Sequence, residues 1–256
     1  MKNQLIYTEE ILFDHYMVSA IGEEHVHSQI PFYIEKDIWG KMKYYGEEIN
    51  RIALEILNEV KGKHKELLNY FDDFPYKEKI FNLKCPLAPM YWTRFDTFID
   101  KDNRVYFSEF NYDKPCGQKE IHLAEKCDFP GNLNEGFIKG IVNYLLEICD
   151  EFTRNKEKIN VGFLMDPCHY EELHHTYYFK DLLKNSKLNI IPVGNNNLSV
   201  KDGYVYAFSK VKLDVILKLF PTEFSYEIKN IEDILEVFDK GKVLLLNDPR
   251  IIGVQA

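Results

Sequence analysis

The sequence predicts an α/β protein that combines an α+β first part with a parallel α/β second part. From about residue 157, hydrophobic strands alternate with helical segments, which is typical of a parallel sheet covered by helices. Before that point, a long helical pattern precedes two alternating strands that are separated by a polar turn. We therefore expect two domains, at 1–155 and 156–256, that join near 153–157.

Composition narrows the class of protein. The chain has 256 residues, of which 45% are hydrophobic, enough to build one large core or two smaller ones. A net charge of -9 argues against a broad nucleic-acid or anionic-membrane surface. The five cysteines form no CxxC pair, which argues against a disulfide framework or a structural zinc site and favours a reducing cytoplasm. No apolar run approaches the roughly 18 residues of a membrane helix, and the start lacks a signal-peptide core.

The first part is expected to contain a long amphipathic helix at about 35–61. Its apolar residues recur at helical spacing and are expected to face a core: Ile38, Met42, Tyr45, Ile49, Ile52, Ile56 and Val60. Shorter helical patterns predict further helices at 63–70, 118–126 and 134–153.

Two alternating strands, at 91–96 and 108–112, form an expected antiparallel hairpin. Each strand alternates large apolar residues with polar ones, and side chains two positions apart share a face of a strand. If the turn comprises the four residues 100–103, Arg94 lies opposite Glu109.

In this register the polar side chains of both strands share one side of the hairpin, namely Arg94, Asp96, Glu109 and Asn111. A planar guanidinium suits phosphate oxygens, and carboxylate and amide oxygens suit a hard cation. The pattern therefore fits a magnesium-bound triphosphate. A cross-strand ion pair on a solvated face, worth ~0.2–1 kcal/mol, fits the hairpin too, and the hairpin taken alone favours that structural interpretation.

The second part shows a regular succession of elements. Strands are expected at 158–165, 188–193, 212–219 and 242–246, and helices at 170–184 and 231–238. A small hairpin at 198–206, which turns at Asp202-Gly203, interrupts the succession. The order predicts a parallel sheet with helices on both faces.

The polar hairpin resembles the signature of an enzyme family. Arg94-Phe95-Asp96 followed by Glu109-x-Asn111-x-Asp113-x-Pro115 is similar to the motif of the circularly permuted ATP-grasp ligases of the glutathionylspermidine synthase type. Later segments resemble the family as well: Asp166 with Glu171-Glu172 and Thr176, residues 198–206, residues 214–216 with 220–223, and residues 247–250. The resemblance spans about residues 91–250, and residues 1–85 add little to it.

The resemblance implies ATP and Mg²⁺ as cofactors. Arg94 would contact the transferring phosphoryl group, and the oxygens of Asp96, Glu109 and Asn111 would hold magnesium on the ATP phosphates. Lys114 is assigned to cofactor binding, with the neutralisation of a carboxylate as its alternative role.

The resemblance also implies two small-molecule substrates, a carboxylate and an amine. Glu171 or Glu172 would lie near the amine or thiol-peptide substrate. Lys114 and Cys116 occupy positions where the prototype has small hydroxyl residues that line the substrate site, so Cys116 is assigned to substrate binding and the identity of the acid stays open. Cys116 would be reactive if Lys114 lowered its pKa, but a merely packed cysteine is the favoured interpretation.

The helix that follows Asp166 carries a second, weaker pattern. Glu172 and His175 form an E-x-x-H motif, which puts both side chains on one helical face. A di-metal bundle needs two such motifs and two further carboxylates, and only one motif is present. We therefore expect His174 and His175 to lie on a solvated helix face.

The implied activity is that of an ATP-dependent carboxylate–amine ligase, which forms an amide through an acyl phosphate. Residues 1–155 would belong to a permuted ATP-grasp domain and 156–256 to a pre-ATP-grasp-like substrate domain. In the family a nucleotide-enclosing lobe follows, whereas this chain stops at Ala256, so we expect an incomplete chain that is inactive by itself.

Two other classes of function stay open. The first is a non-catalytic module, derived from the same family, that binds a small molecule or a partner. The second is a metal-dependent hydrolase, which lacks a plausible general base because no histidine lies near the hairpin in the sequence.

Overall fold

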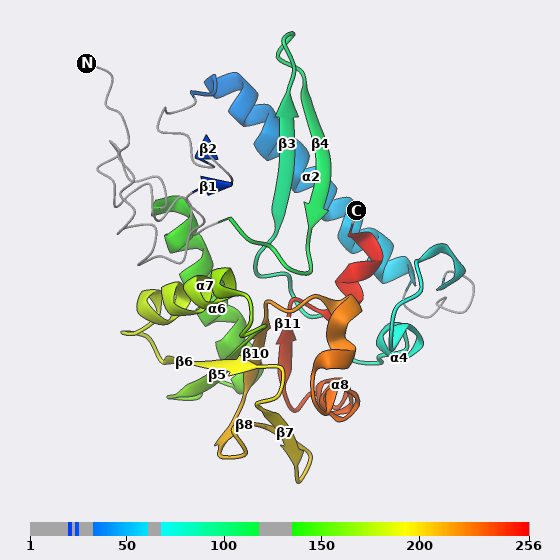
Figure 1. The fold of residues 1–256 in the computed structure, drawn as a ribbon, viewed down its shortest axis with the longest axis vertical. Helices are drawn as coiled ribbons and strands as arrows, with labels where there is room; N and C mark the ends of the chain where they lie inside the picture. The colour runs from blue at the N-terminus through cyan, green and yellow to red at the C-terminus, as the bar shows by residue number, and fades with distance from the viewer. Residues whose placement is uncertain (1–19, 22–23, 26–32, 61–67, 118–134, 256) are drawn as a thin grey trace.

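A computed structural model of the chain describes residues 20–21, 24–25, 33–60, 68–117 and 135–255 (Figure 1). The helix expected at 118–126 lies outside the described residues. Of the helix expected at 63–70, the structure describes only a 3₁₀ turn, η1 (Leu68–Tyr70). A two-residue pairing of β1 (Ala20–Ile21) with β2 (Glu24–His25) is described near the start of the chain.

The second part is built on a four-stranded sheet in the order β11-β10-β5-β6, and every pairing in it is parallel. The strands are β5 (Ile159–Met165), β6 (Leu188–Gly194), β10 (Val215–Lys218) and β11 (Leu244–Leu246). The expected α/β fold is therefore confirmed. The strands read as continuous apolar runs because both faces of the sheet are covered.

Three helices pack with the strands of this sheet: α6 (Glu135–Thr153), α7 (Tyr170–Leu182) and α8 (Ile231–Asp239). A single buried cluster contains side chains of all three helices together with those of the parallel strands. Trp92, which lies just before the hairpin, also belongs to this cluster, so the first part of the chain contributes to the core of the second. The domain boundary at 155/156 stays a prediction.

The small antiparallel insert consists of β7 (Leu198–Lys201), β8 (Tyr204–Ala207) and β9 (Val211–Lys212). The turn between β7 and β8 has a positive φ at Asp202 (52°) and at Gly203 (73°). Two positive φ angles are typical of the tight turn whose twist matches that of the flanking strands. The hairpin expected at 198–206 is confirmed.

The long helix α2 (Lys36–Val60) lies along one side of the hairpin made by β3 (Arg94–Ile99) and β4 (Val105–Asn111) (Figure 1). A side chain at Gly46 would come within 3.4 Å of the ring of Phe95, so the glycine lets the helix approach the hairpin closely. Ala53 and Leu57 continue this contact in a small core of their own.

The expectation that the whole apolar stripe of α2 faces a core is wrong. Tyr45, Ile52 and Ile56 are 45%, 45% and 44% exposed, whereas Ile38, Ala53 and Leu57 are buried. The helix packs on a two-stranded hairpin and on the short C-terminal turn η3 (Pro249–Val254) rather than on a broad sheet. Such a narrow surface covers only one row of helix side chains.

The expected register of the hairpin is also wrong, because Arg94 pairs with Asn111 and Asp96 with Glu109. The turn is one residue longer than expected, with Asn103 in the left-handed region (φ 59°), and an irregularity after Asp96 shifts the pairing again. A shift of one residue in the register would move every side chain of a strand to the other face of the hairpin. Two such shifts together return the four polar side chains to one shared face.

A buried ion pair fastens the end of β4 to the parallel sheet. Asp113 is completely buried and contacts the ammonium of Lys218, the last residue of β10, which is 4% exposed. Lys218 also donates to the carbonyl oxygen of Phe220 (2.9 Å) and to Oγ1 of Thr222 (3.0 Å). The Thr222 hydroxyl and backbone N–H both donate to Asp113, so neither charge is left without hydrogen bonds.

The segment after β11 forms a second set of contacts that connects the two parts of the chain. Oδ1 of Asn247 accepts from the backbone N–H of Tyr91 (2.8 Å), and its Nδ2 donates to the carbonyl oxygens of Trp92 and Tyr112 (both 2.7 Å). The neighbouring Asp248 and Arg250 form a buried ion pair with an Nη2–Oδ2 distance of 2.6 Å. Burial alone would lower the pKa of Arg250, but the adjacent Asp248 carboxylate outweighs it and raises the pKa.

We predict that Lys218→Met lowers the free energy of unfolding by about 3–5 kcal/mol, because it leaves the Asp113 carboxylate buried without a counter-charge. The double variant Asp113→Asn with Lys218→Met should lose less than the sum of the single changes, since no buried charge remains. Denaturant titration of the variants measures both effects.

Lys79→Met provides the control, because Lys79 pairs with Glu232 (3.2 Å) at the surface, where an ion pair contributes about 0–1 kcal/mol. Similar losses for Lys218→Met and Lys79→Met would contradict the role given to the buried pair.

Candidate functional site

Four polar side chains share the face of the β3–β4 hairpin that points away from α2. The opposite face carries Phe95 and Phe110, whose rings meet edge to face at 5.6 Å within the core that α2 completes. Arg94 and Asp96 remain accessible, with 34% and 38% of their side-chain surfaces exposed. The alternation of the two strands thus separates a packed face from an open polar face.

The open polar face is internally connected. Nε and Nη2 of Arg94 donate to the two oxygens of Asp96 at 2.8 and 3.2 Å, which makes a bidentate pair. With its amide nitrogen turned toward Glu109, Asn111 donates to Oε1 of that carboxylate (3.1 Å) and accepts from Nη2 of Arg94 (2.9 Å). All four predicted residues are therefore brought together, in one hydrogen-bonded chain.

The reverse orientation of the Asn111 amide tests whether a cation fits. In that orientation the amide oxygen faces the Glu109 carboxylate, and a cation between the two acceptors would offset their repulsion. Within the described residues, no group of three or more histidine, cysteine, aspartate or glutamate side chains is arranged so that it could hold a metal ion. A metal here would depend on the amide oxygen as third ligand beside Asp96 and Glu109, an oxygen set that suits Mg²⁺.

The turn after β4 makes a second charged contact. Lys114 forms an ion pair with Oε1 of Glu172, which lies in the first turns of α7 and is 2% exposed. The backbone N–H of Asp166 donates to the other oxygen of Glu172 (2.6 Å), and Nδ1 of His169 lies 3.4 Å from Oε1. Lys114 thus neutralises a carboxylate in this structure, and its assignment to cofactor binding stays a prediction.

Burial raises the pKa of Glu172 above its ordinary value, and the nearby Lys114 ammonium opposes this rise without cancelling it. Keeping this carboxylate charged in the folded protein therefore costs desolvation free energy. A hydrogen bond from the backbone of Asp166, rather than one from solvent, fixes its position at the start of α7.

Both charged contacts lie at the point where the strand order of the sheet reverses. From β5 the chain passes through α7 to β6 on one side, and from β10 it passes through α8 to β11 on the other. Ligands of open parallel sheets bind in the crevice outside the carboxyl ends of such strands. Here the turn 113–115 enters this crevice, with Asp113 on Lys218 and Lys114 on Glu172.

The histidines of α7 correct a further expectation. His174 and His175 are 5% and 0% exposed, so they do not lie on a solvated face. The ring of His175 packs 5.4 Å from that of Trp92, and the ring of His174 stacks 6.5 Å from that of Tyr178. The helix is covered by the sheet on one side and by the segment before β3 on another, which its weak amphipathic pattern did not reveal.

The remaining predicted substrate residues are placed differently. The side chain of Cys116 is half-buried against the main core. The side chain of Glu171 lies outside the described part of the structure. The segment reaches the open polar face at Gly117, where an added Cβ would lie 3.5 Å from Cδ of Arg94.

The sequence interpretation missed the residues that position this site, chiefly Lys218 and Asn247. A signal for Lys218 was present, since a lysine at the end of an otherwise apolar buried strand requires a charged or polar partner. Asn247 was recognised only as part of a turn, and nothing in its sequence context shows that its amide joins Tyr91, Trp92 and Tyr112.

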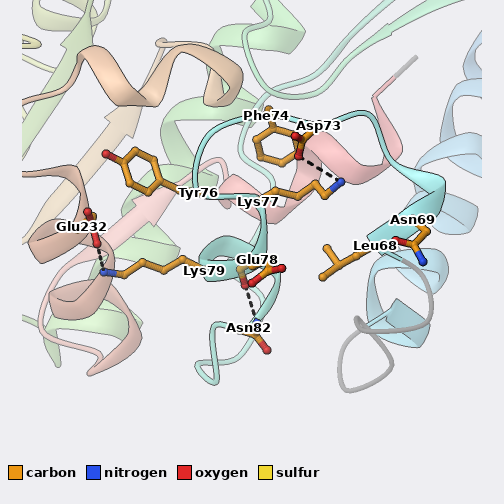
Figure 2. Close-up of a pocket in the computed structure, with 10 residues that line it drawn as sticks. All are labelled: Leu68, Asn69, Asp73, Phe74, Tyr76, Lys77, Glu78, Lys79, Asn82 and Glu232. Atoms are coloured by element: carbon orange, nitrogen blue, oxygen red, sulfur yellow. Dashed lines mark hydrogen bonds and ion pairs between the residues drawn. The ribbon is translucent and has the colours of Figure 1, made fainter.

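A wide groove of about 980 Å³ lies elsewhere, between the η1–α4 region and Glu232 of α8 (Figure 2). The helix α4 (Lys77–Phe81) supplies Lys79, which pairs with Glu232 (3.2 Å). Lys77 donates to the carbonyl oxygen of Phe71 (3.2 Å) and pairs with Asp73 (3.6 Å). Because acidic or carbonyl groups around the groove engage both lysines, we assign it no ligand.

Comparison with known proteins supports the fold. No family model and no curated protein matches the sequence. Among solved structures, the chain is similar to a glutathione synthetase-like effector from Globodera pallida in its apo form, with a TM-score of 0.53 and 11% sequence identity. The alignment covers 96% of this chain and 60% of that one. At this identity the likeness shows a shared fold and nothing finer.

None of the helices in the described residues combines the length and the apolar character that crossing a bilayer requires.

We predict that Glu172 makes stability depend on pH. Its pKa is raised above the ordinary 4.5, so the folded protein holds this proton more tightly than the unfolded chain does. The contribution of the carboxyl group to the free energy of unfolding is therefore full below about pH 4.5 and is lost as the pH rises through the folded pKa. The stability of the wild type relative to Glu172→Gln should fall over that range in denaturant titrations.

Lys114→Met sharpens this experiment. Without the ammonium, burial of Glu172 is opposed less strongly, because only the Asp166 backbone hydrogen bond and His169 still lower its pKa; the loss of stability with rising pH should therefore be larger than in the wild type. A wild-type stability that grows with pH relative to Glu172→Gln would mean that the Lys114 ion pair outweighs burial.

Proposed function

We propose that the chain carries the magnesium- and phosphate-binding side of an ATP-dependent carboxylate–amine ligase of the glutathione synthetase-like type. The observation that supports this proposal best is the open polar face of β3 and β4, which gathers a guanidinium, two carboxylates and an amide. The ligase-like fold of the neighbouring structure agrees with it. The activity of the whole protein and its substrates remain part of the proposal.

Arg94 would bind the phosphoryl group that is transferred. Its guanidinium is always charged and presents a planar fork of donors, which matches the oxygens of a phosphate. In the structure this fork already binds the two carboxylate oxygens of Asp96, at 2.8 and 3.2 Å. A phosphate competing for the same fork would release Asp96 toward the cation.

Asp96, Glu109 and Asn111 would hold magnesium. Both strands place these oxygens on the same face, and Asp96 and Glu109 are directly paired in the register. A magnesium ion held by these oxygens would supply positive charge that offsets the negative charge developing during transfer.

In the proposed reaction the protein would orient the reactants rather than form covalent bonds with them. A carboxylate oxygen of the acid attacks the terminal phosphorus of ATP, the bond to ADP breaks, and an acyl phosphate forms. The amine nitrogen then attacks the acyl carbon, phosphate leaves with the bonding electron pair, and the amine loses a proton to solvent. Arg94 would keep the phosphoryl group in line during the first step.

The substrates would approach from the α7 side of the turn. Glu172 and Lys114 already form an ion pair there, and Cys116 follows two residues later. We assign Glu171, Glu172 and Cys116 to substrate binding on the family resemblance, and the chemistry of the acid and the amine stays open.

A second candidate is a non-catalytic binding module. The four side chains of the open polar face satisfy one another in the absence of a ligand, as a structural network would. A module of this kind would bind its ligand or partner without consuming nucleotide.

We predict that ATP binds this chain in a magnesium-dependent way and that Glu109→Gln removes the dependence. Losing a charged metal ligand should weaken binding of ATP with magnesium by roughly tenfold or more, while binding without the metal changes little. Isothermal titration of ATP, with and without MgCl₂, into both proteins measures the difference.

Arg104→Ala is the matched control, since Arg104 forms the same kind of pair with Asp100 (2.8 Å) in the turn of the same hairpin. It should leave ATP binding unchanged. Equal affinities with and without magnesium in the wild type would remove the metal assignment, and binding of ATP without turnover in any longer natural form would favour the non-catalytic module.

A further inference from the structure

A cavity of about 510 Å³ lies where three segments of the chain meet, and none of them contributes to the open polar face or to the α7 contact. Its walls come from residues 85–89, from the last turns of α6, and from the end of α8 with the segment that leads to β11. Mostly apolar walls and a volume in the range of roughly 300–1,000 Å³ are typical of small-molecule sites. Four of its side chains are buried and belong to the main core: Ile148, Phe238, Val243 and Leu244.

The proline-containing wall of the cavity is fixed by the buried ion pair of Asp248 with Arg250. The backbone N–H of Ala88 donates to Oδ2 of Asp248 (2.9 Å). The guanidinium of Arg250 donates to the carbonyl oxygens of Cys85 and Pro86, both at 3.0 Å. Because the wall is already in place in the unliganded chain, a ligand does not have to order it, and this lowers the free-energy cost of binding.

The thiol of Cys85 also lines the cavity but adds no charge to it. Burial raises the pKa of this thiol to about 11, although the Arg250 guanidinium opposes the rise. The thiol is therefore protonated at neutral pH. Among the described residues that line the cavity, only Glu151 and Arg154 carry a charge.

These two charged side chains mark the mouth of the cavity, because both residues are exposed. Glu151 lies in the last turn of α6, and Arg154 directly follows the last residue of that helix. Neither side chain forms an ion pair or a hydrogen bond with another described residue, and the two do not pair with each other. The cavity thus combines an apolar interior with one positive and one negative group at its mouth.

We propose that this cavity binds an apolar α-amino acid, with its carboxylate on Arg154, its ammonium on Glu151 and its side chain among the apolar walls. A guanidinium presents a planar fork of donors that matches a carboxylate. The Glu151 carboxylate and the partial negative charge at the C-terminal end of α6 both favour an ammonium group. The inference does not depend on the proposed function, since no residue of the cavity belongs to the proposed site.

Ligands with a single charge fit the mouth of the cavity less well. An apolar carboxylate would pair with Arg154 but would bring its negative charge close to Glu151. An apolar amine would pair with Glu151 and would be repelled by Arg154. A zwitterion with an apolar side chain satisfies both groups and keeps its own charges at the exposed mouth, where desolvation costs little.

The test compares L-phenylalanine with three analogues, each titrated into the isotope-labelled 256-residue chain and followed by NMR. Hydrocinnamate lacks the ammonium group, phenethylamine lacks the carboxylate, and glycine lacks the apolar side chain. L-Phenylalanine should bind with a Kd of roughly 1 mM or tighter, from the usual affinity of small ligands per non-hydrogen atom, and should shift the amide signals of Cys85 and Gly241. Each analogue should bind about tenfold more weakly or worse.

Two variants assign the charges separately, and both change exposed residues, so the fold should be kept. Arg154→Gln should weaken the binding of L-phenylalanine about tenfold without weakening that of phenethylamine. Glu151→Gln should weaken the binding of L-phenylalanine by a similar factor without weakening that of hydrocinnamate.

Glu147→Gln is the matched control, because Glu147 is an exposed glutamate about one turn earlier on α6 that does not line the cavity. It should leave the affinity for L-phenylalanine unchanged. If hydrocinnamate or phenethylamine binds the wild type as tightly as L-phenylalanine does, the cavity does not select an amino acid and the proposal is wrong. If L-phenylalanine shifts neither amide signal at concentrations well above roughly 1 mM, the cavity is not its binding site.

Discussion

The buried ion pair between Asp113 and Lys218 is the interaction on which the arrangement of the site depends. Burying two charges costs desolvation energy that only good geometry and further hydrogen bonds offset, and Thr222 supplies those bonds. The pair fixes the end of β4 at the carboxyl edge of β10. Because Asn111 lies two residues before Asp113 and Lys114 directly follows it, the pair holds the open polar face and the α7 contact in a fixed relative position.

The hairpin itself owes its two functions to its two faces. One face is aromatic and packs on α2, and the other presents Arg94 and its partners to solvent. A two-stranded hairpin is rarely stable alone in water. The helix and the amide of Asn247, which holds the carbonyl oxygens of Trp92 and Tyr112, therefore make the open face possible.

The fold is shared with a glutathione synthetase-like effector at 11% identity, so the shape has been kept while most side chains differ. In such a case function must be argued from the site and not from the fold. At the proposed site, the ammonium of Lys114 is paired with the carboxylate of Glu172 at the start of α7.

The sequence by itself determined the α/β class, the order of the elements in the second part and the shared face of Arg94, Asp96, Glu109 and Asn111, because periodicity and strand alternation are local properties. It did not determine the hairpin register, where a left-handed residue at 103 and an irregularity after Asp96 each shift the pairing.

Burial was decided by the tertiary structure. The histidines of α7 and the apolar stripe of α2 were misjudged because a helix pattern shows which residues share a face, but not how wide a surface that face meets. The long-range pairs of Lys218 and Asn247 have no local signature at all, since each joins segments more than 100 residues apart.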